Sequence, residues 1–508
     1  FEFLKKYIDL LALHKMNRLQ LHLTDDQGWR LEIKKHPRLT QIGSLRQESP
    51  KKGSRNEGDA TPYGPYFYTQ KQMREIVAYA QARHVTIVPE IEMPGHFLGA
   101  LAAHPEFSCT GGPFAVRTRW GIEPNILCAG NAQAIAFAQD VLSEVMELFP
   151  SRFIHIGGDE APKDRWKQCA KCQARLKAEG LKDEHELQSY FVRRMDKFIA
   201  SRGRRLIGWD EILEGGLAPG ATVMSWRGVT GGITAAHAGH DVVMSPTSHC
   251  YFDYAQAQGP GEPEAIGGFL PLPTVYAYEP TPADMPEEKK KHILGAQGNV
   301  WGEFLWTPAD VEYFAFPRVA ALAEVVWTPA EAKNYDDFLD RLATHLKRLD
   351  VLGVNYRKLT PDPDRPATPV AQEKSNADQQ FVWTVPGWPM HKILEDWPGQ
   401  TAERKQKVLR AFQEGRFAVH ALPFSTHTEL LELEDLVRGL GFASRLARDA
   451  GLPLPRDAKM TDVPCHSWIL PTLLHHAGVD FLHLGCNAAS TSPEVPPLFW
   501  WEGPDGSH

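Results

Sequence analysis

The hydrophobic positions of the chain alternate between two periods. Segments with apolar residues at helical spacing, such as Met73, Ile76, Val77 and Ala80, are followed by short apolar runs. Seven such runs occur, at 19–23, 85–93, 152–158, 205–211, 222–226, 241–246 and 293–303. Alternating helices and strands predict βα units with a parallel sheet, and runs that are apolar on both faces predict a sheet covered on both sides.

The count of strands indicates a barrel with one strand missing. A (β/α)₈ barrel has eight strands, whereas seven are visible here, and the chain opens on a helical pattern at 3–16. We therefore expect a TIM barrel without its first strand, which would lie upstream of the chain. Further helices are expected at 310–327 and 335–350.

A change of composition divides the chain. Residues 356–380 are rich in Pro, Asp and Gln and poor in apolar residues, which is typical of a linker. We expect a barrel at 1–355, this linker, and a smaller, incomplete α/β region at 381–508 with helices near 401–413 and 428–449.

Composition excludes some partners. The 508 residues carry a net charge of −8 and no long basic run, which argues against nucleic acid. No apolar run approaches the ~20 residues of a membrane span. The first residues show no signal-peptide pattern, but the chain opens within a helical pattern, so an export signal would lie upstream of it. A periplasmic or secreted location therefore stays open.

The cysteines carry weaker signals. Cys109 and Cys128 flank a Gly-rich loop and could form a disulfide, and Cys169 and Cys172 form a C-x-x-C. A zinc site usually needs a second pair of ligands, and none is evident near this motif. Buried or loosely paired thiols are therefore favoured over a metal.

Polar residues gather where the predicted strands end. The sequences there include HLTDDQGW, PEIEMPGH, HIGGDE, GWDE and NVWGE. A single Asp in such a place is often a helix cap, and a single Trp is often core. The repetition at successive strand ends, where barrels carry their chemistry, predicts an active site on this rim.

The residue types on the rim favour a sugar. Trp209, Trp226, Trp301 and Tyr251 offer flat apolar faces, and the carboxylates among them can bind hydroxyls. HIGGDE lacks the basic residue of a phosphate loop. The carboxylates stand beside tryptophans, so a divalent metal site ranks lower.

Long motifs resemble one family. LHKMNRLQLHLTDDQGWRLEIKKHPRLT, PEIEMPGH, HIGGDEAPKDRW, GWDEIL, YFDYAQ and GAQGNVWGE stand in the order and spacing of glycoside hydrolase family 20, the β-N-acetylhexosaminidases. The resemblance covers roughly 1–357. It implies a (β/α)₈ barrel that releases terminal β-linked N-acetylglucosamine or N-acetylgalactosamine, with no cofactor and no metal.

The resemblance also implies a role for each of the two adjacent carboxylates. The family works by substrate assistance, in which the 2-acetamido oxygen of the sugar attacks its own anomeric carbon. Glu160 matches the general acid/base, and Asp159 matches the residue that orients the acetamide. Tyr251 matches the hydroxyl that binds the acetamide oxygen. Gly157 and Gly158 let both carboxylates enter one pocket.

Other residues match binding positions of the family. Three tryptophans match its aromatic box, two carboxylates match contacts to sugar hydroxyls, and an Asp–His pair matches the support behind the acid. These are Trp209, Trp226 and Trp301, then Asp253 and Glu303, then Asp25 and His96. His155 is expected to be structural. The family's sugar-clamping Arg would lie ahead of Phe1 and is not in this chain.

The second region partly resembles glycoside hydrolase family 38. The stretch around KMTDVPCHSW would place a nucleophile and zinc ligand at Asp462, with His466 nearby. Cys465 stands where a glycine is usual, and four zinc ligands cannot be assembled. A non-catalytic or incomplete domain is expected.

Two alternatives to the substrate-assisted enzyme remain. One is a double-displacement β-glycosidase with Glu160 as acid and Glu303 as nucleophile, which needs carboxyls about 5–5.5 Å apart. The other is a sugar-binding fragment that is inactive because its first strand is missing.

Overall fold

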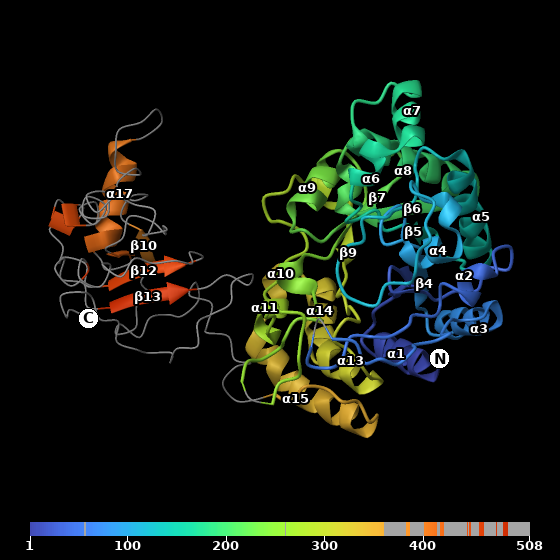
Figure 1. Ribbon diagram of the computed structural model, residues 1–508. Coiled ribbons are helices and arrows are strands. Elements are labelled where there is room, and N and C mark those ends of the chain that lie inside the picture. Colours follow the sequence, from blue (N-terminus) through green and yellow to red (C-terminus); the bar gives the residue numbers. More distant parts are fainter. Residues whose placement is uncertain are drawn as a thin grey trace. The chain divides into compact units, whose positions relative to one another are not determined.

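The computed structural model describes residues 1–54, 57–259 and 261–359, and beyond them only short segments. These segments are 383–386, 401–413, 417–420, 444–445, 447–448, 457–461, residue 474 and 481–485. The chain forms two compact units, Phe1–Arg365 and Pro366–His508 (Figure 1).

The first unit is built on one parallel sheet of seven strands. They are β1 (Arg18–His22), β4 (Thr86–Glu90), β5 (Phe153–His155), β6 (Arg205–Trp209), β7 (Thr222–Ser225), β8 (Val242–Met244) and β9 (Ile293–Ala296). They are hydrogen-bonded in the order of the chain, and every pair is parallel. The predicted seven strands are confirmed. A small antiparallel pair, β2 (Thr24–Asp25) and β3 (Gly28–Trp29), follows β1.

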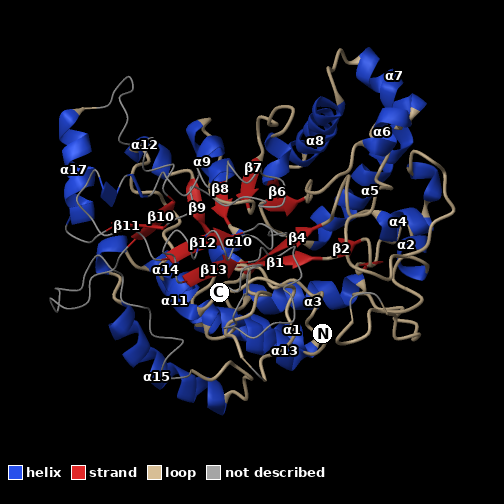
Figure 2. Ribbon diagram, turned by 60° about the vertical axis from the view of Figure 1, so that its left-hand side comes forward, coloured by secondary structure: helices blue, strands red, loops and turns tan. Residues whose placement is uncertain are grey.

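Helices surround this sheet (Figure 2). Those of ten or more residues are α1 (Glu2–Leu13), α3 (Gln70–Gln81), α5 (Ala132–Leu148), α8 (Glu184–Ser201), α14 (Arg318–Trp327) and α15 (Tyr335–Val351). Shorter ones are α2 (Arg38–Gln41), α4 (Leu98–Ala103), α6 (Asp164–Gln168), α7 (Ala170–Ala178), α9 (Thr230–His237), α10 (Thr247–Cys250), α11 (Leu272–Tyr276), α12 (Glu287–Lys290) and α13 (Pro308–Ala315). Short 3₁₀ turns occupy Pro105–Phe107, Asp210–Leu213 and Ala330–Ala332.

Capping residues and apolar spacing explain the long helices. In α3 the side chain of Thr69 accepts a hydrogen bond from the Gln72 amide, while Gln72 bonds back to the Thr69 amide. This reciprocal pair satisfies two amides that the helix itself leaves without partners. Asn131 and Asp183 cap α5 and α8 in the same position. The buried faces of these helices pack against the sheet and form one continuous core.

The predicted helix 310–327 is wrong in one respect, because two helices occupy it. The helix α13 ends at Ala315, and α14 begins at Arg318, after Pro317. Proline lacks an amide N–H and its ring clashes with the preceding helical turn, so the chain breaks here. The buried guanidinium of Arg318 uses the break: it donates to the carbonyl oxygens of Phe252 (2.6 Å) and Leu270 (2.9 Å).

The first residues of the predicted linker contact the first unit. Tyr356 and Arg357 are buried, and the Arg357 amide donates to the Phe316 carbonyl oxygen at 3.1 Å. These residues therefore pack on the first unit. The division between the units, after Arg365, falls inside 356–380. Residues 360–382 lie outside the described residues.

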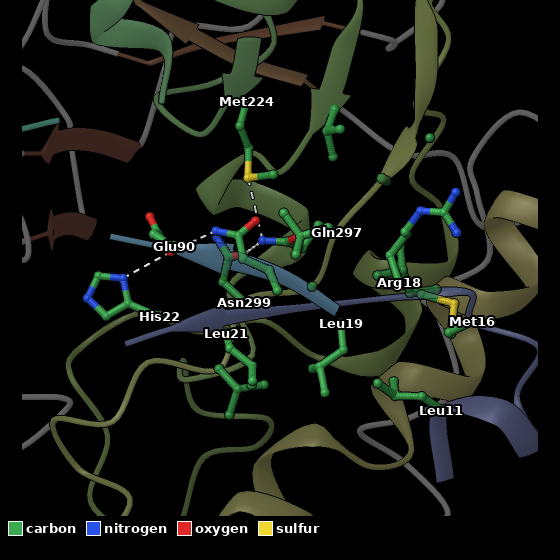
Figure 3. A pocket seen from close by; sticks show the side chains of 18 of the residues that line it. Leu11, Met16, Arg18, Leu19, Leu21, His22, Glu90, Met224, Gln297 and Asn299 are labelled. Carbon is green, nitrogen blue, oxygen red and sulfur yellow. Dashed lines mark hydrogen bonds and ion pairs between the residues drawn. The ribbon is translucent and has the colours of Figure 1, made fainter. Parts of the chain in front are cut away.

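The sheet is open between its two end strands. No residue of β1 or β9 is buried, whereas most residues of the five strands between them are. A cavity of about 830 Å³ is lined by both edges, with Leu19 and Leu21 from β1 and Leu294 and Ala296 from β9. Figure 3 shows the two leucines of β1 on one side of the strand and His22 at its end beside Glu90. The fold is a curled seven-stranded sheet rather than a closed barrel.

The second unit contains two parallel strand pairs. β10 (Trp383–Pro386) pairs with β11 (Phe417–His420), and β12 (Asp457–Thr461) pairs with β13 (Phe481–Gly485). The helix α17 (Ala402–Gln413) matches the helix expected at 401–413. The positions predicted for a family 38 site, Asp462, Cys465 and His466, lie outside the described residues, as does most of 428–449.

Among the described helices, none combines the length and apolar character that crossing a lipid bilayer requires.

Candidate active site

The turn after β5 places two neighbouring carboxylates in one site. Gly157 and Gly158 have φ of +67° and +93°, a region that residues with a Cβ atom rarely adopt. A Cβ on Gly157 would lie 1.6 Å from Oε2 of Glu92, so a side chain there would require the Glu92 carboxylate to move. Glu160 itself has φ of +41°. The chain thus leaves strand geometry before Asp159, as the sequence predicted.

His96 contacts both carboxylates. Its Nε2 atom lies 3.6 Å from Oδ2 of Asp159 and 3.4 Å from Oε2 of Glu160. Adjacent residues of a regular strand would point to opposite faces. Here they converge on one imidazole, so both carboxylates belong to the same site.

The other ring nitrogen of His96 faces two aspartates. Nδ1 lies 3.3 Å from Oδ1 of Asp25 and 3.3 Å from Oδ2 of Asp26. Burial favours the neutral ring, but hydrogen bonds with Asp25, Asp26 and Glu160 outweigh it and raise the pKa of His96 well above 6.5. The predicted contact of Asp25 with His96 is present. Asp26, which the sequence did not single out, is fully buried and also accepts from the Leu98 amide.

The side chain of Asp159 is 14% exposed, and its hydrogen-bonding capacity is only partly used. Burial raises the pKa of its carboxyl, the charge of His96 opposes this, and the charge of Glu90 adds to it. Its Oδ1 atom accepts no hydrogen bond from another residue in the described part of the chain. Asp159 therefore offers a buried acceptor to a ligand N–H or O–H.

Aromatic side chains stand on the same rim. The rings of Trp209 and Trp301 are 5.9 Å apart, and those of Trp226 and Tyr251 are 6.3 Å apart and nearly parallel. Trp226 donates to Glu211 at 2.9 Å. Burial raises the pKa of Tyr251, so its hydroxyl stays protonated and can donate. The predicted aromatic residues thus form two neighbouring pairs.

Asp253 and Glu303 form a further acidic pair. Asp253 is 4% exposed, and neither of its carboxylate oxygens accepts a hydrogen bond from another residue among those described. Burial, and then the charge of Glu303, raises the pKa of Asp253 to about 7. Burial also raises the pKa of Glu303. Buried acceptors without protein donors suit the hydroxyls of a ligand.

Comparison with known proteins agrees with this geometry. Residues 1–330 match the catalytic domain of glycosyl hydrolase family 20. The chain belongs to this family. A β-hexosaminidase of Porphyromonas gingivalis is 52% identical over 366 residues, which cover 72% of this chain and 46% of that protein. A β-hexosaminidase of Akkermansia muciniphila is 35% identical over 67% of this chain and 68% of its own length.

Solved structures show the same family. A family 20 exo-β-N-acetylglucosaminidase of Vibrio harveyi, in complex with N-acetylglucosamine, superposes with a TM-score of 0.63 at 35% identity. It is covered over 56% of its length, and 70% of this chain is matched. The chain thus spans between about half and two thirds of the length of these relatives. The family 38 interpretation of 381–508 receives no support from these matches.

Sequence reasoning missed a buried network beneath the family 20 site. Glu90 accepts from Nε1 of Trp209 (2.9 Å) and from the amide of Gln20 (2.8 Å). His155 and His22 each place Nδ1 3.0 Å from it. Burial opposes ionisation, but the charges of His155 and His22 lower the pKa of Glu90 well below 4.5.

This network positions the rim residues. Glu90 fixes the indole of Trp209, and His22 connects it to Asp25 through a 2.9 Å hydrogen bond from Nε2. The signal in the sequence was a charged residue inside an apolar run, in VTIVPEIEM. A buried charge needs partners, so both Glu90 and Glu92 could have been flagged. His155, which the sequence predicted to be structural, is fully buried, and its Nδ1 atom lies between the Glu90 carboxylate and the Gly157 amide.

Glu211 is a second residue that the sequence did not single out. Burial, and then the charge of Asp159, raises its pKa to about 7. It accepts the indole N–H of Trp226. Its neighbour Asp210 serves the backbone instead, accepting from the amides of Trp226 and Arg227.

The cysteine prediction needs a correction. The C-x-x-C at Cys169 and Cys172 does have a second pair beside it, because the Sγ atoms of Cys109, Cys128, Cys169 and Cys172 all lie within 4.8 Å of one another. The expectation that no second pair lies near was wrong. The loop that carries Cys109 and Cys128 reaches the helices after β5, which sequence spacing cannot reveal.

Proposed function

We propose that this chain is the catalytic part of an exo-acting β-N-acetylhexosaminidase, which releases terminal β-linked N-acetylglucosamine or N-acetylgalactosamine from oligosaccharides or glycoconjugates. Membership of family 20 and the names of the relatives support this. The observation that carries it is the convergence of Asp159 and Glu160 on His96, next to the aromatic pairs.

The residues divide the reaction between them. The Glu160 carboxyl donates its proton to the glycosidic oxygen as the bond to the anomeric carbon breaks. The acetamide oxygen of the substrate forms the new bond to that carbon, giving an oxazolinium ion. Asp159 accepts the acetamide N–H and stabilises the positive charge that develops on it. Water then attacks the anomeric carbon, the bond from this carbon to the acetamide oxygen breaks, and the Glu160 carboxylate takes the proton of the water. Two inversions at the same carbon retain the β configuration.

The side chains next to Asp159 and Glu160 support these reaction steps. His96 is protonated at neutral pH because its pKa is raised well above 6.5. It lies 3.4 Å from Glu160 and stabilises the carboxylate that remains after proton transfer. Tyr251 donates its hydroxyl to the acetamide oxygen and aligns it for attack.

The sugar ring is held by the remaining rim residues. Trp209, Trp226 and Trp301 pack against its C–H faces and the acetamide methyl. Asp253 and Glu303 accept hydrogen bonds from its hydroxyls. Because a sugar O–H finds an unpaired, buried carboxylate at Asp253, an analogue without that hydroxyl would bind much more weakly.

The proposal also includes an eighth strand, which would lie between β1 and β9. The two edges line one cavity, are less buried than the strands between them, and are the end strands of the sheet. A parallel strand in this slot would pair with both edges and close the sheet into a (β/α)₈ barrel.

The test compares two substrates and one variant. The full chain, and the same chain extended by the upstream sequence of its gene, are assayed with an aryl β-N-acetylglucosaminide and the matching aryl β-glucoside. We expect hydrolysis of the first alone, lost in Glu160→Gln. Equal rates on both would favour the double-displacement glycosidase with Glu303 as nucleophile. Binding without turnover by either protein would favour an inactive sugar-binding fragment.

A further inference from the structure

Four cysteines form a cluster outside the sugar site. Three of the six Sγ–Sγ distances are 3.7 Å for Cys109–Cys172, 3.7 Å for Cys128–Cys169 and 3.6 Å for Cys128–Cys172, and all six are within 4.8 Å. All four are free thiols. A disulfide would bring two of the sulfur atoms to about 2.05 Å, so the spacing is that of four separate sulfurs around a common centre.

The spacing fits a tetrahedral metal site. Zinc binds thiolates at about 2.3 Å, which places the sulfurs of a tetrahedral Cys₄ site about 3.8 Å apart. The observed 3.6–3.7 Å agrees with this value. We propose that Cys109, Cys128, Cys169 and Cys172 bind one structural Zn²⁺ ion.

The backbone, and not the sulfurs alone, holds the ligands in place. The antiparallel bridge between Ser108 and Leu127 brings together the two segments that carry Cys109 and Cys128, and the Cys128 amide donates to the Phe107 carbonyl oxygen at 2.9 Å. A Cβ on Gly130 would lie 2.3 Å from the carbonyl carbon of Lys171 and 2.4 Å from the amide nitrogen of Cys172. Only glycine allows this approach of the Cys128 loop to the C-x-x-C segment.

The burial of these thiols, and their weak interactions with one another, favour a bound metal. Cys128, Cys169 and Cys172 are buried, and Cys109 is half-buried. Thiols are weak hydrogen-bond donors, so four of them packed together gain little from each other. As thiolates around Zn²⁺ they would each form a metal bond, and with four protein ligands the site is closed, which is typical of a structural and not a catalytic zinc.

The ion would join the two segments that carry the catalytic groups. Leu127, next to Cys128, donates its amide to the carbonyl oxygen of Pro94, two residues before His96. Trp166, between Glu160 and Cys169, donates its indole N–H to the Leu127 carbonyl oxygen at 3.0 Å. Zinc at this junction fixes the loop after β4 to the helices after β5. Its role is to position both segments.

The experiment measures metal and thiols in the purified full chain, independently of activity. Elemental analysis should find one zinc per chain, and thiol titration of the native protein should find the cluster unreactive until a chelator is added. Cys172→Ser and Cys109→Ser should lose the zinc. Cys250→Ala, which removes a buried cysteine outside the cluster, should keep it.

Cobalt substitution tests the site in the wild-type chain, so its result does not depend on whether the variants fold. Removing zinc from the wild-type chain and adding Co²⁺ should produce the visible bands of a tetrahedral tetrathiolate complex. Zinc-free protein with four reactive thiols, a disulfide among these cysteines, or iron in place of zinc would each overturn the proposal. None of these results would bear on whether the sugar site is active.

Discussion

Asp159 and Glu160 are neighbours in the sequence, yet both carboxylates lie within 3.6 Å of one atom, Nε2 of His96. The shared imidazole does not make them equivalent. The side chain of Asp159 is 14% exposed, while that of Glu160 is 35% exposed. In the proposed mechanism the more accessible carboxyl exchanges protons with a leaving group and with water, and the less accessible one accepts the acetamide N–H.

The dependence of kcat/KM on the leaving group should distinguish the role of Glu160 from that of Asp159. In Glu160→Gln, kcat/KM on a disaccharide should fall by about 10²–10⁴-fold because the leaving sugar needs a proton. On a dinitrophenyl glycoside, whose leaving group needs no acid, the loss should be small. In Asp159→Asn the loss should be similar on both substrates, since acetamide attack is impaired in each case. Glu147→Gln, at an exposed position of α5, is the control. Equal leaving-group dependence in both variants would contradict this division.

The pH dependence of kcat/KM should report the ionisation of Asp253. Its pKa is raised to about 7, first by burial and then by the charge of Glu303. An ionised carboxylate accepts stronger hydrogen bonds from sugar hydroxyls, so kcat/KM should rise as pH increases through about 7. Asp253→Asn should remove this limb. Glu303→Gln should move it to lower pH, because a like charge has gone. A limb that stays in place in both variants would assign it to another group, such as Glu211.

Gly157 should be intolerant of any side chain. In Gly157→Ala the new Cβ meets the Glu92 carboxylate at 1.6 Å, in addition to the strain of a φ of +67°. Gly203 has φ of +70° and nothing within 4 Å of its virtual Cβ. Gly203→Ala should therefore cost about 1 kcal/mol of unfolding free energy from backbone strain alone. Gly157→Ala should cost about 1–3 kcal/mol more from overpacking. Urea unfolding of both variants measures the difference, and equal losses would show that Glu92 moves aside freely.

The stability of the first unit should fall at alkaline pH through His22. Burial disfavours its charge, but Glu90 and Asp25 outweigh burial and raise its pKa from 6.5 to about 10. A raised histidine pKa stabilises the fold fully below pH 6.5, and this contribution is lost as pH rises towards about 10.

His22→Gln is the corresponding test. At pH 7 the variant should be less stable by roughly 2–4 kcal/mol, and its unfolding free energy should then decline less steeply than that of wild type up to pH 10. His237→Gln, at an exposed position, should follow the wild-type curve. Parallel curves for wild type and His22→Gln would show that His22 is not charged in the folded state.

The strands were predictable because each coincides with an apolar run, and the rim because polar residues follow the strands. The division of α13 from α14 was also readable in principle, since Pro317 stands in the predicted helix. The Glu90 network was less accessible. Its members come from β1, β4, β5 and β6, and only the sheet register brings Gln20, His155 and Trp209 to the same carboxylate.

The cysteine cluster shows the same limit more sharply. The 40 residues between Cys128 and Cys169 include all of α5 and β5, so their distance in space depends on how the βα unit folds back. Sequence spacing identifies a C-x-x-C, but it cannot say which distant loop lies opposite. The glycine at 130, which allows the close approach, carries no such information by itself.

The open sheet has a consequence for how the chain behaves in solution. A flat sheet with two free edges can add strands at either end without limit, as aggregating sheets do. Here β1 and β9 line the same cavity, together with exposed apolar surface such as Leu294. One segment placed in that cavity would use up both edges and cover this surface at once. The binding of one strand would then both protect the sheet from aggregation and complete the site, and no further strand could add to it.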